Sequence, residues 1–309
     1  MTAYVVRRLL WMPVVVLAVA LVTFALGLYG PGDPVEVLLG PRQNPEAVAR
    51  LRHEWGLDQP FAIQFVRYVG RVLRADFGES YKFRGQPVAE LLAPRMWVSA
   101  QLAFVAMVIS FAIGVPAGVI AATRQGRWLD TAVVGLTLLG ISTPVFVVAP
   151  ILQWIFTRQL HWLPTAGWEG IFSTKIILPA LVLGIPPIAG IARQTRSAVL
   201  EVIAQDYVRT ARAKGLAERI VLTRHILRNA LIPVITLLGF FLADLPSGAL
   251  IVESIFGIPG VGRLAFESIF ARDYPVIMAT TLVGAVSFVL ANLVVDIAYT
   301  FVDPRIRYK

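Results

Sequence analysis

The stretch 206–216 reads Asp-Tyr-Val-Arg-Thr-Ala-Arg-Ala-Lys-Gly-Leu, and it continues through Ala-Glu-Arg-Ile-Val-Leu-Thr-Arg-His-Ile-Leu-Arg-Asn-Ala-Leu-Ile to Pro233. We call residues 206–233 the basic segment. Its cations are Arg209, Arg212, Lys214, Arg219, Arg224 and Arg228. The segment stands out because it is a charged, helix-prone island in a chain that is otherwise strongly apolar.

Apolar residues recur in the basic segment at roughly helical spacing, which predicts a helix with one apolar side. They are Val208, Ala211, Leu216 and Ile220. Gly215 interrupts the run, and glycine enters a left-handed turn at little cost. The pattern predicts a helix, a glycine corner and a second helix that lie beside a membrane. The alternative is a solvated charged loop that joins two membrane spans.

The composition points to a membrane protein. Hydrophobic residues make up 57% of the 309 residues and charged residues 15%, which is too apolar for an ordinary soluble domain. The chain has no cysteine, so disulfides and thiolate metal sites are excluded. Its net charge of +9 fits the accumulation of Lys and Arg on the cytoplasmic side of membrane proteins. No aromatic-interleaved basic patch argues for a nucleic-acid partner.

Six apolar runs are long enough to cross a bilayer, which takes about 20 residues in a helix. The predicted spans are 9–29, 97–123, 129–156, 176–195, 229–252 and 276–301. Prolines inside the third and fourth spans are compatible with a bundle whose neighbouring helices satisfy the freed backbone groups. The first run follows Arg7 and Arg8, and its alternative is a signal peptide cleaved near Ala25-Leu26-Gly27.

The spans divide the chain into four parts. Residues 1–29 are the N-terminus and first span, 30–96 an insertion, 97–302 the core with the other five spans, and 303–309 a tail. The insertion has mixed charge, and its amphipathic stretches 45–55 and 60–73 predict that it is partly helical. An all-α integral membrane protein is therefore expected.

The distribution of Lys and Arg predicts the orientation. Fifteen of the 28 lie in the two termini, the turn 124–127 and the basic segment with the end of the span before it. Four lie in the two short loops opposite, and nine in the long insertion, which the positive-inside rule discounts. We therefore expect both termini and the basic segment in the cytoplasm and the insertion outside.

The sequence offers no constellation for catalysis. His53, His161 and His225 fall in three separate segments, which argues against a shared metal site. None of the four lysines follows a glycine, as a phosphate-binding P-loop requires. No Gly-x-Ser-x-Gly elbow is present. We expect no metal, cofactor or ATP bound by this chain, so any energy from ATP must come from a partner.

Asp244 is the acid that falls deepest inside a predicted span. Acids within membrane spans are costly and often functional. Asp244 therefore either faces a polar translocation pathway or bonds to a neighbouring helix.

Several blocks spread over the chain point to one family. They are Arg7-Arg8-Leu9-Leu10, Pro31-Gly32-Asp33-Pro34, Gly56-Leu57-Asp58, Asp76-Phe77-Gly78-Glu79-Ser80-Tyr81, Tyr207–Leu216, Leu227–Pro233, Gly257-Ile-Pro-Gly-Val-Gly262 and Asp303-Pro-Arg-Ile-Arg307. Together they resemble the transmembrane permease subunits of dipeptide/oligopeptide ABC importers. The resemblance covers essentially the whole length. It implies the type I importer permease fold with six helices, located in the cytoplasmic membrane.

The resemblance also implies a role for the basic segment. Such permeases present a cytoplasmic coupling helix, here at about 204–222, to a groove on a separate ATPase. The general importer pattern is Glu-Ala-Ala, three residues and Gly; here Arg209-Thr210-Ala211 precedes Gly215, as in the peptide branch. The expected ATPase-coupling residues are Asp206, Tyr207, Arg209, Thr210, Ala211, Arg212, Lys214, Gly215 and Leu216.

The remaining implications concern the outer side and the partners. Asp76, Phe77 and Gly78 are expected either to shape an outer vestibule or to cap the helix ends. The implied partners are a homologous permease, two ATPases that bind ATP and Mg²⁺, an extracytoplasmic substrate-binding protein and the lipid bilayer. The implied function is ATP-driven import of short peptides. The alternatives are import of oligosaccharides or nickel by the same machinery, or an ion-coupled secondary transporter that uses Asp244.

Overall fold

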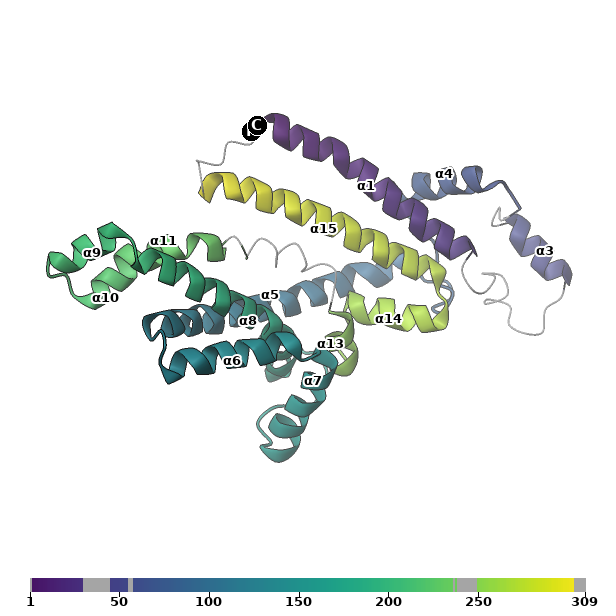
Figure 1. Ribbon diagram of the computed structural model, residues 1–309. Helices are drawn as coiled ribbons and strands as arrows, with labels where there is room; N and C mark the ends of the chain where they lie inside the picture. Colours follow the sequence, from purple (N-terminus) through teal and green to yellow (C-terminus); the bar gives the residue numbers. More distant parts are fainter. Residues whose placement is uncertain (1, 30–44, 55–57, 236, 238–248, 303–309) are drawn as a thin grey trace.

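The computed structural model describes residues 2–29, 45–54, 58–235, 237 and 249–302, and these are mainly helical (Figure 1). Within these ranges the one β-type pairing is an isolated bridge between Glu79 and Pro87. The elements in chain order are α1 (Thr2–Tyr29), α3 (Pro45–Glu54), α4 (Phe61–Val72), α5 (Val88–Thr123), α6 (Trp128–Ser142), α7 (Val145–Gln153), η1 (Trp154–Gln159), η2 (Thr174–Ile176), α8 (Ile177–Ile203), α9 (Asp206–Ala213), α10 (Glu218–Ile220), η3 (Val221–Leu227), α11 (Arg228–Ala230), α13 (Leu250–Ile255), α14 (Val261–Ala271) and α15 (Tyr274–Val302).

Four helical stretches in the described residues are long and apolar enough to cross a membrane. They are Leu10–Tyr29, Val88–Thr123, Thr174–Ile203 and Tyr274–Leu293. A bent pair, α6 with α7 and η1, raises the number to five if the pair is one span. Half of the fifth predicted span, 229–252, lies outside the described residues, and so does Asp244. The six predicted spans are therefore matched here by four, or up to five.

The third predicted span is not one continuous helix. The run 129–156 is divided between α6 and the following α7 and η1, and the two parts meet at 109°. Thr143 has extended backbone angles (φ −91°, ψ 120°) and precedes Pro144, which caps α7. Proline pushes the residue before it out of the helical region and has no N–H to continue the hydrogen-bond ladder. The predicted span with Pro144 inside it is therefore interrupted, because this proline ends one helix and starts another.

The second span belongs to a longer helix than predicted. Helix α5 begins at Val88, nine residues before the predicted start at 97, and has 36 residues. At 1.5 Å per residue it is about 54 Å long, well beyond the roughly 30 Å of a hydrocarbon core. Charged residues within 88–96 suggested an insertion. Val88, Leu91 and Leu92 are nevertheless buried at helical spacing in a cluster with α14 and α15, so the helix continues.

Helices α5 and α8 form the tightest pair, and glycines bring their backbones together. A Cβ on Gly118 would lie 2.4 Å from the Ala192 carbonyl oxygen, and one on Gly184 would lie 2.9 Å from Ser110 Oγ. The Ser110 hydroxyl donates to the Gly184 carbonyl at 3.2 Å. Small residues at such contacts allow the close approach that stabilises helix pairs in membranes.

Helices α1 and α15 lie side by side, apart from the α5–α8 pair (Figure 1). Gly27 of α1 faces Met278, whose sulfur would be 2.8 Å from an added Cβ. The same end of α1 carries Phe24, which stacks or tilts against Phe61, Phe65 and Tyr68 of α4 at ring-centroid distances of 5.1–5.7 Å. These contacts fix α4, within the predicted insertion, against the end of the first span.

Candidate functional site

The basic segment folds as a helix, a corner and a second helix at the end of α8. Helix α8 ends at Ile203, α9 runs from Asp206 to Ala213, and α10 begins at Glu218. Gly215 between them has φ +75°, and its N–H donates to the Arg212 carbonyl at 2.9 Å. A Cβ on Gly215 would meet nothing within 4 Å, so the backbone angle rather than space demands glycine here. The predicted glycine corner is thus present.

The predicted apolar side of the basic segment is divided between two environments. Val208 and Ala211 are buried in a cluster with Ala198 and Val199 of α8 and with Val221. Leu216 and Ile220 are instead 37% and 41% exposed. The predicted apolar residues are thus divided at the glycine corner, the first two buried against α8 and the last two at the surface. One half holds α9 to its own bundle, and the other is left on the surface.

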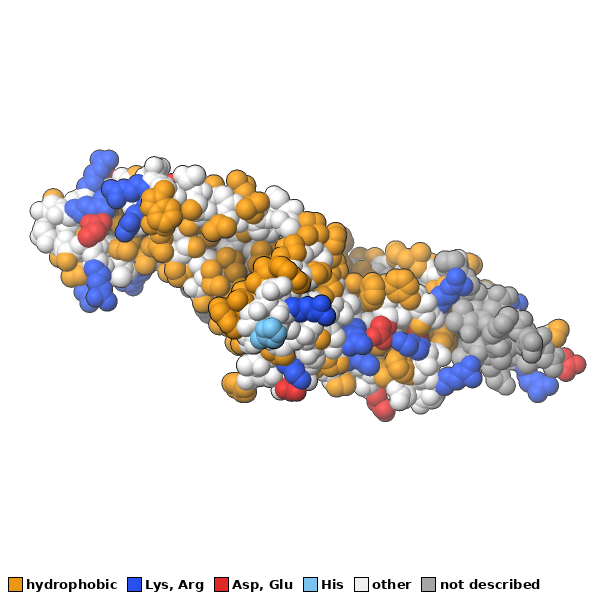
Figure 2. Space-filling model, turned by 90° about the horizontal axis from the view of Figure 1, so that it is seen from below, with side chains coloured by type: hydrophobic (Ala, Val, Ile, Leu, Met, Phe, Trp, Pro, Cys, Tyr) orange, Lys and Arg blue, Asp and Glu red, His pale blue; other side chains and the backbone are white. Residues whose placement is uncertain are grey.

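The charges of the basic segment are at the surface. Figure 2 shows Lys and Arg gathered at the end of the molecule that α9 and α10 form, next to a largely hydrophobic middle. Arg212 pairs with Glu218 across the corner through two hydrogen bonds of 2.7 and 3.1 Å. The Arg212 hydrogen bonds lower the pKa of Glu218, and the same bonds raise the pKa of Arg212. This exposed pair braces the corner.

The other predicted coupling residues surround this pair. Asp206 contacts Arg209 weakly at 3.5 Å, and the Tyr207 hydroxyl accepts a hydrogen bond from Asn229 at 3.0 Å. The Thr210 hydroxyl donates to the Asp206 carbonyl at 3.0 Å, and the Lys214 side chain is exposed. The nine predicted residues therefore lie on α9 and the glycine corner after it, with eight exposed and Ala211 buried.

Asp76, Phe77 and Gly78 form a tight loop just before α5, far from the basic segment. The Asp76 carboxylate accepts hydrogen bonds from Gly78 N at 2.9 Å and Arg71 Nε at 3.0 Å. The Gly78 hydrogen bond and the Arg71 guanidinium lower the pKa of Asp76. Gly78 has φ +82°, and its carbonyl accepts from Val88 N. All three residues border an open cleft of about 870 Å³ between α1, α4 and the start of α15.

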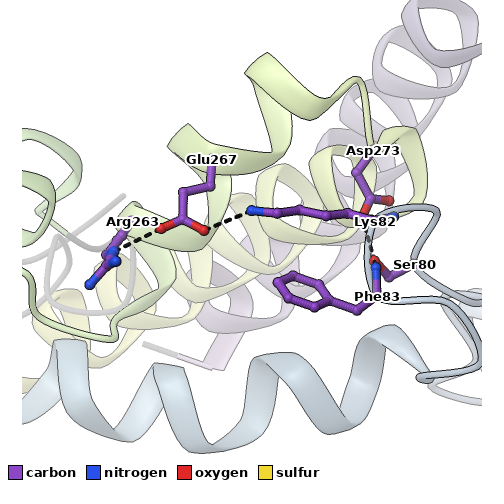
Figure 3. A network of polar contacts seen from close by, with 6 residues as sticks. All are labelled: Ser80, Lys82, Phe83, Arg263, Glu267 and Asp273. Atoms are coloured by element: carbon purple, nitrogen blue, oxygen red, sulfur yellow. Dashed lines mark hydrogen bonds and ion pairs between the residues drawn. The ribbon is translucent and has the colours of Figure 1, made fainter. Parts of the chain in front are cut away.

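Asp273 anchors the loop that follows, and sequence reasoning missed it. Its side chain is fully buried, and the Ser80 hydroxyl and the backbone N–H groups of Tyr81 and Lys82 all donate to it (Figure 3). The donors are about 190 residues away in sequence, so no local pattern marks the contact. The one feature of the sequence that pointed to Asp273 was its place as an acid beside Arg272, between two apolar stretches.

A second contact joins the same loop to α14. The Lys82 ammonium bonds to Glu267 at 2.9 Å, and Glu267 also accepts from Arg263 Nε at 2.8 Å (Figure 3). Hydrogen bonding to Lys82 first, and also to Arg263, lowers the pKa of Glu267. The loop 80–83 is therefore held to the α14–α15 region by two carboxylates, one buried and one half-exposed.

Glu253 is the third acid that the sequence analysis did not single out. It is fully buried on α13. Its carboxylate accepts hydrogen bonds from Ser99 Oγ at 2.6 Å, Arg263 N at 2.9 Å and Ala249 N at 3.1 Å. It thus joins α5, α13 and α14 around the Gly257–Gly262 block, which was quoted only for its resemblance.

The carboxylates of these regions hold helices and loops in place through the contacts given above. No group of three or more His, Cys, Asp or Glu side chains suited to a metal ion occurs among the described residues. The two candidate regions lie near opposite ends of α5 (Figure 1).

Comparisons with known proteins agree with this architecture. Residues 114–308 match the family described as binding-protein-dependent transport system inner membrane component, and residues 1–99 match the N-terminal family of the same membrane components. A probable peptide ABC transporter permease from Sinorhizobium fredii is 41% identical over 314 residues, and the dipeptide transport permease DppB of Alkalihalophilus pseudofirmus is 39% identical over 336. The glutathione transport permease GsiC of Salmonella paratyphi A is 41% identical over 312 residues. Each alignment covers 100% of both chains.

A solved structure supports the fold. The inward-facing MetNI methionine ABC transporter contains a chain that matches with a TM-score of 0.55 at 22% identity, covering 69% of this chain and 96% of that one. The two family matches together cover nearly the whole chain, and the described helices include several that are long and apolar enough to span a membrane. This chain belongs to the family of multi-pass inner membrane components of binding-protein-dependent transport systems.

Proposed function

We propose that this chain is a permease subunit of an ATP-driven importer of short peptides. The observation that carries the proposal is full-length similarity, at 39–41% identity, to proteins named as peptide, dipeptide and glutathione permeases. The chain does no bond chemistry in this proposal; ATP and Mg²⁺ are bound by partner subunits. It works with a second, homologous permease, two ATPases and an extracytoplasmic substrate-binding protein.

The proposed topology has six spans, with both termini and the basic segment in the cytoplasm. Five of the spans are candidates in the described residues when the bent pair of α6 with α7 and η1 is counted as one, and the run 229–252 supplies the sixth. The bias of Lys and Arg toward the basic segment and termini supports this orientation. Because α5 is longer than a bilayer is thick, its two ends suit opposite sides of the membrane.

The coupling element, residues 204–222, is proposed to dock in a groove of an ATPase. Its exposed Leu216 and Ile220 supply an apolar anchor, and Arg209 and Lys214 supply a cationic rim. Helix-in-groove recognition uses this combination. The buried Val208 and Ala211 attach the element to α8. When two ATPases close on ATP, the element moves, and the bundle changes the side to which its pathway opens.

The outer loop 76–83 is proposed to shape the vestibule where a binding protein delivers cargo. Its two carboxylate anchors, Asp273 and Glu267, support a fixed loop rather than a loose connection. The cleft beside Asp76, Phe77 and Gly78 supplies an open outer surface. Asp244 stays a prediction, either as a pathway residue or as a partner of another helix.

The experiment is uptake by proteoliposomes that contain the complete importer. Radiolabelled di- and tripeptides with the cognate binding protein should enter only when MgATP is present on the ATPase side. Because the chain has no cysteine, Lys214→Cys can carry a single crosslinker that should reach an ATPase subunit. Uptake that follows an ion gradient without ATP would support the secondary transporter instead. If the assembly imports an oligosaccharide or nickel and no peptide, the cargo belongs to one of those classes instead.

A further inference from the structure

An ion pair joins α6 to α8 close to the basic segment. Asp130, in the first turn of α6, is only 6% exposed. Arg196 of α8 donates to both of its oxygens, from Nε at 2.6 Å and from a terminal guanidinium nitrogen at 2.8 Å. The backbone N–H of Gly126 also donates to this carboxylate at 3.0 Å. A two-pronged contact fixes both the distance and the relative orientation of the two helices.

The position of this pair along α8 matters. Arg196 lies seven residues before Ile203, where α8 ends, which is about 10 Å along the helix; α9 begins at Asp206. Close backbone packing occurs at the same level, because a Cβ on Gly118 of α5 would meet Thr195 Cβ at 2.6 Å. Any displacement of the basic segment therefore reaches this level of α8 first.

Helix α8 also has a weak point beyond the ion pair. Pro186 and Pro187 lie inside the helix, and each lacks the N–H that would bond to the preceding turn. A force on the end of α8 would bend the helix there unless neighbouring helices move with it. Gly140 of α6 faces α8 on both sides of the prolines, where an added Cβ would be 3.3 Å from the Ile185 side chain and 3.5 Å from Ala189 Cβ.

We propose that Asp130 and Arg196 are positioning residues that make α6 move with α8 when the basic segment is displaced. Apolar contacts allow helices to slide, whereas the two-pronged ion pair does not. Loss of Arg196 would leave the largely buried carboxylate of Asp130 unpaired, and loss of Asp130 would leave the part-buried guanidinium of Arg196 without its partner. The inference rests on the proposed coupling role of the basic segment and adds the route by which its motion reaches α6.

The first test measures peptides imported per ATP hydrolysed in proteoliposomes with the complete importer. Asp130→Asn keeps the side-chain shape but removes the charge; it should lower this ratio by about fivefold or more, the lower end of coupling between sites. The exchange Asp130→Arg with Arg196→Asp should recover a substantial part. Glu169→Gln, which breaks an exposed pair with Lys175 in another loop, is the matched control and should leave the ratio unchanged.

The second test measures motion directly with spin labels. Leu136→Cys on the exposed side of α6 and Thr223→Cys on η3 introduce two labels into a chain without cysteine. With the ion pair intact, their distance should stay the same whether or not ATP is bound. In the Asp130→Asn background it should shift or broaden on ATP binding. If Asp130→Asn is not recovered as folded protein, Arg196→Lys replaces it, because lysine keeps the charge without the two-pronged contact.

The outcomes separate this inference from the proposed function. An unchanged ratio in Asp130→Asn, an exchange variant no better than the single one, or an ATP-dependent distance in the intact protein would each overturn the role of the ion pair. Absence of ATP-driven uptake by the unmodified assembly would refute the proposed function instead.

Discussion

Glu253 gives the sharpest test of how the helices of this protein are held together. Glu253→Gln replaces one carboxylate oxygen with an amide N–H₂ group at nearly constant size. Two of the three hydrogen bonds converge on Oε1, from Ser99 and Ala249, and the third reaches Oε2 from Arg263 N. Whichever way the amide turns, a donor will face at least one donor. The site has no room to relax, because a Cβ on Gly260 would lie 2.4 Å from Oε2.

The loss of unfolding free energy in Glu253→Gln can be worked out from these contacts. A hydrogen bond to a charged group contributes about 1.5–3 kcal/mol, and leaving a buried donor unpaired costs about 1–3 kcal/mol. We expect Glu253→Gln to lower the free energy of unfolding by roughly 3 kcal/mol, with one charge-assisted bond lost and one N–H left unpaired. The thermal midpoint should fall by several degrees, since 1 kcal/mol moves it by about 2–4 °C in chains of this order of size.

The assay is thermal unfolding of the purified permease in detergent, followed by the tryptophan fluorescence of its seven tryptophans. Glu201→Gln is the matched control, because Glu201 is an exposed acid on α8. It should leave the midpoint unchanged. If Glu253→Gln unfolds at the wild-type temperature, the carboxylate does not hold α5, α13 and α14 together, and the argument from these distances fails.

Three further predictions concern single positions. Gly215→Val should abolish most coupled uptake although the protein still inserts into the membrane, because a branched residue resists φ +75°. The control is Gly170→Val, which carries similar strain at φ +91° in a distant loop and should leave uptake intact. Gly118→Ala should lower the free energy of unfolding by about 1–3 kcal/mol, and with it the thermal midpoint, because the added methyl group overpacks against the Ala192 carbonyl. Gly190→Ala should raise the midpoint slightly, because a Cβ there meets nothing within 4 Å and alanine favours the helix. The pKa of Glu267 is lowered, so its pairing stabilises the outer loop fully above the ordinary pKa of 4.5, and this stabilisation is lost as pH falls through the lowered pKa. Hydrogen exchange of residues 80–83 should accelerate over that range. This part of the pH dependence should be missing in Lys82→Met. Equal exchange profiles for wild type and Lys82→Met would contradict the last prediction.

Local patterns in the sequence predicted the local features of the fold. The apolar run after Arg8 indicated α1, and the amphipathic stretch 60–73 indicated α4. Gly215 was identified as a corner because glycine adopts a positive φ at the least cost. The bend at Pro144 was missed although the proline was visible, because prolines inside spans are also tolerated without a break. Periodicity cannot distinguish these two outcomes; the conformation of Thr143 does.

The carboxylates that hold the helices together could not be predicted in the same way, because their partners are distant in the sequence. Ser99 and Glu253 are 154 residues apart, and Asp130 and Arg196 are 66 apart. In the sequence a buried acid cannot be told from a surface acid, because the hydrogen-bond donors that make its burial possible come from distant segments. Without such donors, burial of the acid would be costly. Glu253 and Asp273 each accept three hydrogen bonds while fully buried, so they mark the places where α5 and the outer loop meet α13–α15. The Asp130–Arg196 pair likewise marks the place where α6 meets α8 near the basic segment.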